Sequence, residues 1–494
     1  MSRSNPSALS VQTIIGLEIH VQLATHSKLF CGCSTRYGQP PNTQTCPICQ
    51  GLPGTLPVIN QHAIELALDV GLAFDMELVS GCRWDRKHYF YPDLPKGYQT
   101  SQYDLPITRS GRLEFRDPAN AETLRSVRIN RAHLEEDAGK SLHDEGVDGG
   151  TWIDLNRTGT PLLEIVTEPD LRSAQDAKAF LQQLRTILLY IGVSDCNMQE
   201  GSMRVDANVN LRIDDGAQTI ATPIVEIKNL NSFRNVERAI EFERDRQWQH
   251  WQATGERLGQ RPKQTRGWDA DREVTTVQRE KEEAADYRYF PCPDLPPVVL
   301  SSEQIAARRL KLPRLPQQWK ADLISVWKLS DYDASVIVEQ GRDVAEYFET
   351  VARISQDGKR SANWITQEIM RLLNEQQRPI TEFPISAQQM GELVLAVSTN
   401  ELDHARAREI FALWLEQPSS LAEAKQSLGI AAISSDEVEQ LVADIVAQHP
   451  AAIDDYRQGK KQALGPLIAQ AKKLNPNVSP AKFREALLRA VDGR

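Results

Sequence analysis

The sequence predicts an α+β fold that gives way to an all-helical one. Up to about residue 300 the apolar residues mostly recur with period two, with helices interspersed, and beyond it the period is helical almost throughout. Strands combined with helices that cover one sheet face are typical of the α+β class. With 494 residues, and roughly 150 residues per domain, the chain accommodates about three domains.

We therefore predict three parts along the chain. Residues 1–298 are expected to form an antiparallel sheet with helices, 299–418 an all-α helical domain, and 419–494 a small helical tail domain. The first boundary follows the change of period. The second follows the proline-containing segment EQPSS, because proline ends helices.

Three predicted strands share one design, with an apolar face and a polar face. They are the segments TIIGLEIHVQL (13–23), RVDANVNLRI (204–213) and IVEIKN (224–229). Because side chains alternate along a strand, Glu18 and His20 point the same way. By the same rule Asp206 lies on the polar face of the second strand, and Glu226 and Lys228 on that of the third.

The most strongly patterned helix runs from Ser173 to about Ile191. Ser173 and Asp176 form an S-x-x-D capping box, and Gly192 is placed to end the helix. Its apolar stripe is expected to cover the apolar face of the sheet. Two further helices are predicted, one from about Asn235 to Thr254 and a shorter one after Asn60.

Four cysteines form two close pairs. Cys31-x-Cys33 is followed by Cys46-x-x-Cys49, and four thiolates so spaced can hold a tetrahedral Zn²⁺. Four sulfurs close the coordination shell, so the metal would be structural. The alternative is four unliganded thiols. The chain has seven cysteines in all, an odd and sparse set that argues against a disulfide framework.

The segment HLEEDAGKS (133–141) ends like a phosphate-binding loop, but the glycine that such a loop needs is a leucine. What remains is the acidic run Glu135, Glu136 and Asp137, followed by Lys140. Together with the polar strand faces, these groups suit Mg²⁺ and nucleotide phosphates, whose charge Lys140 and Lys228 could neutralise. The alternative is that the polar residues merely face solvent on one side of an antiparallel sheet.

Aromatic residues are concentrated in residues 85–104. Tyr89, Tyr91 and Tyr98 are interleaved there with cations such as Lys96, so the segment could stack a base or a terminal adenosine while its cations contact phosphate. It could equally be an aromatic plug under a proline-rich turn.

The charge is unevenly distributed. The whole chain carries −10, whereas residues 451–494 contain nine Lys/Arg against four acids, a net charge of +5. A basic tail on an acidic body suggests that a polyanion is bound at one end, and the alternative is a solvated helical surface. The candidate contacts in this tail are Lys460, Lys461, Lys472 and Lys473.

Composition excludes a membrane protein and a secreted one. The hydrophobic share of 40% and charged share of 25% are ordinary globular values, and no stretch approaches the roughly 18 apolar residues of a membrane span. Residues 1–15 lack a continuous apolar core between a basic start and a small-residue cleavage site. A cytoplasmic location is therefore expected.

Six motifs occur in a fixed order along nearly the whole chain. They are GLEIHVQL, DRKHYFYPDLPKGYQ, HLEEDAGKS, DLNRTGTPLLEIVTEPD, MRVDANVNLR and EIKNLNS. Together they closely resemble the GatB family, the B subunits of the bacterial and organellar tRNA-dependent amidotransferase. The resemblance implies a catalytic cradle domain, then a helical domain, then a tail domain of the YqeY type that approaches the tRNA elbow.

The resemblance also implies an activity. The family converts Glu mischarged on tRNA(Gln), or Asp mischarged on tRNA(Asn), into the amide, and both substrates stay open here. The B subunit uses ATP to phosphorylate the side-chain carboxylate. Ammonia released from glutamine by the A subunit, an amidase, then displaces the phosphate, and a small C subunit holds the other two together. This is a carbon–nitrogen ligase of the EC 6.3.5 type.

By this resemblance Mg²⁺ is bound by His20, Glu136 and Glu226. Residues expected close by are Glu18, Glu135 and Asp206, with Lys140 and Lys228 for phosphate, Asn229 for the substrate's polar groups, and Tyr89, Tyr91, Lys96 and Tyr98 for the end of the tRNA. Strand parity alone does not choose between Glu135 and Glu136. The four cysteines match the zinc-bearing members of the family, which favours a stabilising role for the metal.

Two other functions compete with this one. The chain could be a non-catalytic tRNA-binding scaffold, in which case amidation would survive loss of the acidic residues. It could also be a free-standing ATP-dependent amide ligase that acts on a small carboxylate, in which case ammonia-dependent ATP hydrolysis would need no tRNA.

Overall fold

The computed structural model describes residues 9–142, 150–214, 216, 218–280, 287–376, 378–431 and 434–492. The chain divides into two compact units, the first ending at Leu315 and the second beginning at Pro316. The first unit extends past residue 298 by one helix, because Arg308 on α4 (Ser302–Lys311) donates to Asp69 on α1 (Gln61–Ala73) at 2.6 Å. The division near residue 418 stays a prediction.

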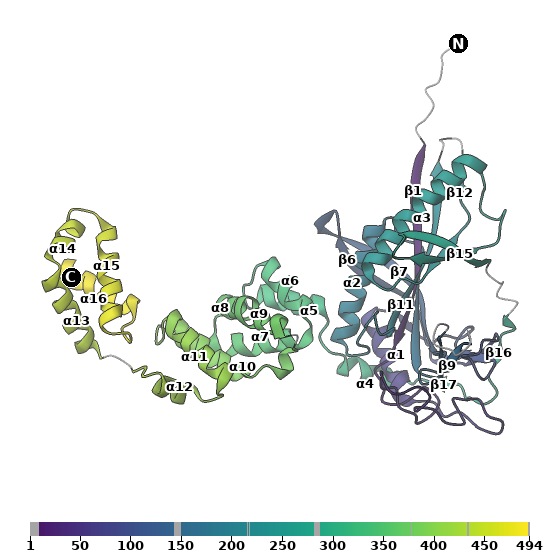
Figure 1. Cartoon of the computed structure of the whole chain (residues 1–494), viewed down its shortest axis with the longest axis horizontal. Coiled ribbons are helices and arrows are strands. Elements are labelled where there is room, and N and C mark those ends of the chain that lie inside the picture. The colour runs from purple at the N-terminus through teal and green to yellow at the C-terminus, as the bar shows by residue number, and fades with distance from the viewer. Residues whose placement is uncertain are drawn as a thin grey trace, which may run out of the picture. The chain divides into compact units, whose positions relative to one another are not determined.

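The first unit is built on a ten-stranded sheet, of which β1, β7 and β11 are labelled in Figure 1. Its strand order is β15-β14-β13-β11-β1-β10-β7-β6-β2, with β12 paired to β11. The bounds are β1 Ser10–Gln22, β2 Glu77–Leu78, β6 Thr108–Asp117, β7 Asn120–Glu136, β10 Pro161–Thr167, β11 Met203–Asp214, β12 Thr219–Ala221, β13 Val225–Lys228, β14 Gln264–Asp269 and β15 Val274–Glu280. Its pairs are antiparallel except β13 with β14, which is parallel. The predicted α+β class is confirmed.

Two long helices cover the apolar face of this sheet, α2 (Ala174–Tyr190) and α3 (Phe233–Thr254). Ile15, Leu17 and Ile19 on β1 are fully buried and share one core with Phe180 and Leu184 of α2. Burying that apolar surface holds the helices in place and leaves the other face of the strands for polar residues.

The start of α2 differs from the predicted reciprocal capping box. The Ser173 hydroxyl accepts a hydrogen bond from the Asp176 backbone N–H, as expected of an N-cap. The Asp176 carboxylate instead accepts two hydrogen bonds from Arg125 on β7, at 2.6 and 2.7 Å. The acid therefore ties the helix to the sheet.

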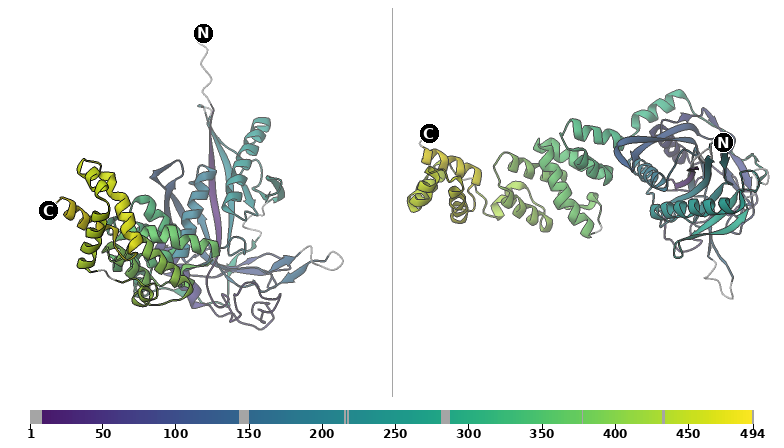
Figure 2. Two further views of the ribbon diagram at one scale, coloured as in Figure 1. Left: turned by 60° about the vertical axis from the view of Figure 1, so that its left-hand side comes forward. Right: turned by 90° about the horizontal axis from the view of Figure 1, so that it is seen from above.

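The first unit also contains smaller sheets. β16 (Phe290–Pro291), β4 (Asp85–His88) and β5 (Tyr98–Ser101) form a three-stranded sheet, which brings the 290 region beside the predicted aromatic segment. β17 (Val298–Val299) pairs with β3 (Gly81–Cys82), and β8 (Lys140–Leu142) pairs with β9 (Trp152–Asp154). The β8–β9 pair extends away from the rest of the unit (Figure 2).

The second unit is helical, as predicted. Its bounds are α5 Pro316–Ser325, α6 Asp331–Glu339, α7 Arg342–Ser355, α8 Gly358–Asn363, the π-helix η3 Trp364–Ile369, α9 Met370–Gln376, the 3₁₀ turn η4 Ile380–Glu382, α10 Ala387–Ser398, α11 His404–Glu416, α12 Leu421–Ser427, α13 Ser435–Gln448, α14 Pro450–Arg457, the 3₁₀ turn η5 Lys461–Ala463, α15 Leu464–Leu474 and α16 Pro480–Asp492. Helices α13–α16 contribute to a hydrophobic cluster of their own, centred on Ile445, Phe483 and Leu487. Across the described residues, no helix combines the length and the apolar character needed to span a bilayer.

Candidate active site

The polar face of the large sheet lines a solvent-open cavity of about 1030 Å³, here called the acidic cavity. It holds five carboxylates, two histidines and the cations of Lys87, Arg131 and Lys228. The acidic side chains are Glu18, Glu135, Glu164, Asp206 and Glu226, and the histidines are His20 and His133. They come from five adjacent strands, so strand pairing brings them together.

One group of potential metal ligands consists of His20, Glu135 and Glu164, with ligand atoms within 4.8 Å of one another. His20 lies directly opposite Glu164 in the β1–β10 ladder. Its Nε2 is 3.3 Å from Glu164 Oε2 and 3.4 Å from Glu135 Oε1. Burial by itself lowers the pKa of His20, but the hydrogen bond and charge of Glu164, with the charge of Glu135, raise it to about 9.

A second group consists of Glu18, Asp206 and Glu226, which satisfy the same 4.8 Å criterion. Glu18 is paired with Asp206 in the β1–β11 ladder. Lys228 forms an ion pair with Asp206, and its Nζ is 3.6 Å from Glu226 Oε1. Burial disfavours the charged lysine, but the charges of Asp206 and Glu226 outweigh burial and raise the pKa of Lys228, so it stays protonated at neutral pH.

The donor atoms of both groups suit a divalent cation. Hard cations such as Mg²⁺ prefer carboxylate oxygens, and an imidazole nitrogen beside carboxylates also suits Mn²⁺. Three carboxylates gathered with a single lysine, as in the second group, leave negative charge that a cation would neutralise. The residues present therefore fit one cation at each group.

Glu136 does not join these groups, so the structure does not bring the predicted trio of His20, Glu136 and Glu226 together. Side chains alternate along β7, so Glu135 faces the acidic cavity while Glu136 faces the other side of the sheet. Among the described residues no potential ligand group contains Glu136. The structure thus separates the two acids that the sequence left undecided and places Glu135 beside His20.

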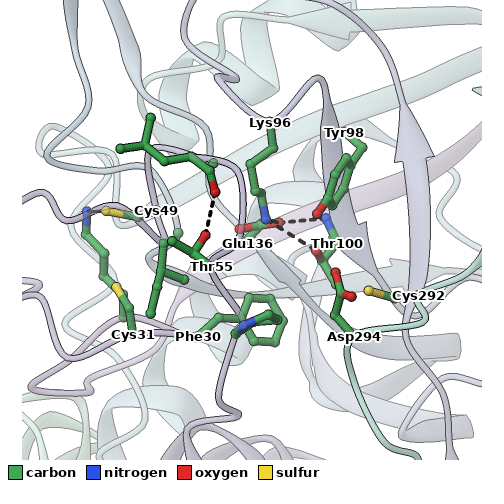
Figure 3. Close-up of a pocket in the computed structure, with 16 residues that line it drawn as sticks. Phe30, Cys31, Cys49, Thr55, Lys96, Tyr98, Thr100, Glu136, Cys292 and Asp294 are labelled. Atoms are coloured by element: carbon green, nitrogen blue, oxygen red, sulfur yellow. Dashed lines mark hydrogen bonds and ion pairs between the residues drawn. The ribbon is translucent and has the colours of Figure 1, made fainter.

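Glu136 lies instead in a second cavity of about 640 Å³ (Figure 3). Its carboxylate forms an ion pair with Lys96 and accepts a hydrogen bond from the Thr100 backbone N–H at 2.8 Å. Lys96 and Tyr98, predicted to contact the end of the tRNA, line this cavity and not the acidic one. Tyr98 is covered by the Arg86 guanidinium, 4.3 Å from the ring centroid.

Glu164 is a site residue that the prediction missed. It lies on β10 within the segment PLLEIVT, where alternation groups Leu162, Glu164 and Val166 on one face. That alternation is visible in the sequence. What the sequence does not show is that β10 pairs with β1, which is the pairing that sets Glu164 opposite His20.

The remaining residues predicted to contact phosphate or substrate lie partly inside and partly outside the acidic cavity. Lys228 lines the acidic cavity, as described above. Lys140 is exposed on β8 and is not among the described residues that line the acidic cavity. Asn229 follows β13 with a positive φ of 64° and is likewise outside that lining. Tyr89 and Tyr91 pack edge to face, with centroids 5.9 Å apart, and belong to the lining of neither cavity.

The four cysteines lie together, with their sulfur atoms within 4.8 Å of one another. Cys46 and Cys49 Sγ atoms are 4.0 Å apart, close to the roughly 3.8 Å expected for a tetrahedral zinc with roughly 2.3 Å Zn–S bonds. Lys28 is completely buried, and its Nζ is 3.6 Å from Cys49 Sγ. The donor set fits a closed structural zinc site.

Some of the lysines of the tail that were predicted to contact a polyanion form ion pairs with acidic residues of the protein itself. Lys472 forms an ion pair with Asp403 and donates to the Pro476 carbonyl at 2.6 Å, and Lys460 Nζ is 2.8 Å from Asp455. Lys473 is exposed. The side chain of Lys461 lies outside what the structure describes.

Comparison with known proteins places these features in a family. Residues 13–306 match the model of the GatB/GatE catalytic domain, and residues 346–491 match that of the GatB domain. The chain is 53% identical to the B subunit of an aspartyl/glutamyl-tRNA(Asn/Gln) amidotransferase from Rhodopirellula baltica, covering 97% of this chain and 96% of the relative. Proteins of the same name from Chlorobium phaeobacteroides strain BS1 and Gloeothece citriformis are 43% and 42% identical, over 98% and 99% of this chain and 100% and 99% of those relatives.

Proposed function

The chain belongs to the GatB family, and from this premise we propose that it is the B subunit of an aspartyl/glutamyl-tRNA(Asn/Gln) amidotransferase. It is part of a carbon–nitrogen ligase that amidates the side chain of Glu or Asp while the amino acid is esterified to tRNA. The observation that carries this function is the acidic cavity, where two groups of cation ligands share one sheet face.

The chemistry explains why the cavity is acidic yet contains cations. A carboxylate resists attack by ammonia because its oxygen is a poor leaving group. Transfer of the γ-phosphoryl group of ATP to that carboxylate releases ADP and forms an acyl phosphate. Ammonia then attacks the carbonyl carbon, inorganic phosphate leaves with the C–O electron pair, and the nitrogen loses a proton.

The residues of this chain position and neutralise the reacting groups. His20, Glu135 and Glu164 would hold one divalent cation, and the group of Glu18, Asp206 and Glu226 a second. Such cations, when bound, draw negative phosphate and carboxylate oxygens together and neutralise their charge. Lys228 stays charged beside the second group and would contact phosphate, whereas Lys87 and Arg131 contribute cations on the cavity wall.

The same family membership supports the other components of the proposal. ATP and Mg²⁺ are the cofactors, and Zn²⁺ at the four cysteines is structural. An amidase, the A subunit, releases ammonia from glutamine, and a small C subunit completes a heterotrimer. The exposed Lys473 and neighbouring basic residues of the tail would contact tRNA phosphates.

The first prediction tests the cation groups. Glu164→Gln and Glu226→Gln each remove one ligand charge while keeping the side-chain volume, so both should lower tRNA-dependent ADP formation and amidation by at least about 100-fold. The measurement uses the assembled complex with mischarged tRNA, ATP and glutamine.

A matched control is Glu114→Gln, an exposed acid on β6 of the same sheet, which should leave the rate unchanged. If amidation survives in both cavity variants, the chain is a scaffold. If ammonia-dependent ATP hydrolysis proceeds equally without tRNA, it is a free-standing amide ligase.

A further inference from the structure

Tyrosines from separate parts of the chain meet at the rim of the acidic cavity. Tyr103 follows β5, and Tyr289 precedes β16. Their rings are stacked face to face, with centroids 4.1 Å apart and an interplanar angle of 14°. Tyr287 continues the row edge-on, 6.1 Å from Tyr289. We refer to Tyr103 and Tyr289 as the tyrosine pair.

The tyrosine pair belongs to the acidic cavity and also reaches solvent. Both residues line that cavity. Burial and the charges of Glu135 and Glu164, which belong to the first cation group, raise the pKa of the Tyr289 hydroxyl. Tyr103 remains 46% exposed although Tyr289 covers one of its ring faces. A large aromatic surface is therefore presented beside the reacting centre.

The exposed ring of Tyr103 lies on the lining of the acidic cavity together with positively charged side chains. Other aromatic rings of the same region are used structurally: His88 stacks on Phe290 at 4.9 Å, and Arg86 covers Tyr98. An exposed flat ring next to cations is the feature by which proteins stack an unpaired base. Lys87 and Arg131 on the same cavity wall supply such cations.

We propose that the tyrosine pair stacks the base of the terminal adenosine of the tRNA. This inference rests on the proposed function. In an aminoacyl-tRNA the reacting amino acid and the terminal base are attached to the same ribose, so the base is held close to the cavity when the side-chain carboxyl enters it. The adenine of ATP is the other source of a purine, but the ribose and two phosphates separate it from the transferred γ-phosphoryl group.

Steady-state kinetics of the assembled complex test this assignment. Tyr103→Leu removes the ring and should raise KM for mischarged tRNA about tenfold, because one stacked base contributes on that order. Tyr103→Phe keeps the ring and should stay within about twofold of the wild type. KM for ATP should not change in either variant.

A fluorescence measurement gives a readout independent of turnover. tRNA carrying 2-aminopurine in place of the terminal adenine should lose fluorescence on binding to the wild-type complex and to Tyr103→Phe, and not on binding to Tyr103→Leu. Tyr289→Leu provides a second variant on the other ring of the pair. Tyr332→Leu removes a tyrosine that is 75% exposed on α6 of the helical unit and serves as the control.

Each contrary outcome is distinct. A rise in KM for ATP with no change for tRNA would assign the pair to the nucleotide and overturn the proposal. Equal losses in Tyr103→Phe and Tyr103→Leu would assign the effect to the hydroxyl group, and quenching that persists in both leucine variants would exclude stacking. Absence of amidation in the wild-type complex would refute the proposed function, whereas the fluorescence result would still report on the tyrosine pair.

Discussion

At the scale of single residues, charge and burial decide what each acidic side chain can do. Glu135 and Glu136 are neighbours in sequence and both almost completely buried, yet one lies beside His20 and the other forms an ion pair with Lys96. A buried carboxylate needs a charged or hydrogen-bonded partner, and the two find different ones on opposite faces of β7. The side chains that face each carboxylate therefore decide what that carboxylate can do.

Lys28 provides a prediction at this scale. Its buried ammonium donates to the Gln44 carbonyl at 2.8 Å and approaches Cys49 Sγ, so it offsets part of the charge of four thiolates. Lys28→Met should weaken zinc binding by about tenfold to 100-fold, as loss of an outer-shell partner of a metal ligand commonly does. Competition with a chelator of known affinity measures this.

Two comparisons separate a role at the metal from a role in packing. Cys46→Ser removes a ligand and should lower zinc content further than Lys28→Met does. If Lys28→Met lowers the unfolding temperature equally in zinc-loaded and zinc-free protein and leaves zinc affinity unchanged, the lysine only supports the fold.

At the scale of secondary structure, the pairing of strands brings the polar residues of separate segments together into one site. β1 is flanked by β10 and β11, so the polar positions of three strands form rows across the sheet. His20 meets Glu164 on one side, and Glu18 meets Asp206 on the other. A slip of one residue in either pairing would turn these side chains to the apolar face, where α2 and α3 pack, so the buried core fixes the register.

Helix α15 yields a prediction from two adjacent lysines. Lys473 is exposed, whereas Lys472 forms an ion pair with Asp403, the N-cap of α11. Lys473→Gln should lower tRNA affinity and leave stability unchanged. The slope of log affinity against log salt concentration should fall by about the amount expected for one phosphate contact. Lys472→Gln should mainly lower the unfolding temperature.

Binding at several salt concentrations, alongside thermal unfolding, distinguishes the two lysines. The Asp403 pKa is lowered, since burial, which raises it, is outweighed by the hydrogen bond from Lys472. The wild-type stability from this pair is therefore present above the usual aspartate pKa and lost as pH falls through the lowered value. A Lys472→Gln protein that kept wild-type stability at neutral pH would contradict this account.

At the scale of the whole molecule, the tail and the acidic cavity are built on separate cores. Helices α13–α16 contribute to their own hydrophobic cluster, and the ten-stranded sheet buries another. Residues 346–491 match the GatB domain model, which spans the predicted boundary near 418. Every described residue that lines the acidic cavity belongs to the first unit.

Removal of residues 434–494 tests this separation. In the assembled complex the shortened chain should bind tRNA more weakly, with a smaller salt slope, because the basic tail is gone. Turnover at saturating tRNA should remain within a few-fold of the full chain, since the cation groups are untouched. An unchanged affinity and an unchanged salt slope would show that the tail does not bind tRNA.

The amino-acid pattern alone was enough to establish the α+β class, the shared strand face of Glu18 and His20, the cysteine cluster and the family. These follow from local alternation, from short spacings and from motifs, which are all readable along one chain. The tertiary structure decided that Glu135 and not Glu136 faces His20, that Glu164 joins them, and that Tyr103 stacks on Tyr289. The physical reason is that strand order and register, fixed by burial of the apolar face, choose which distant residues become neighbours.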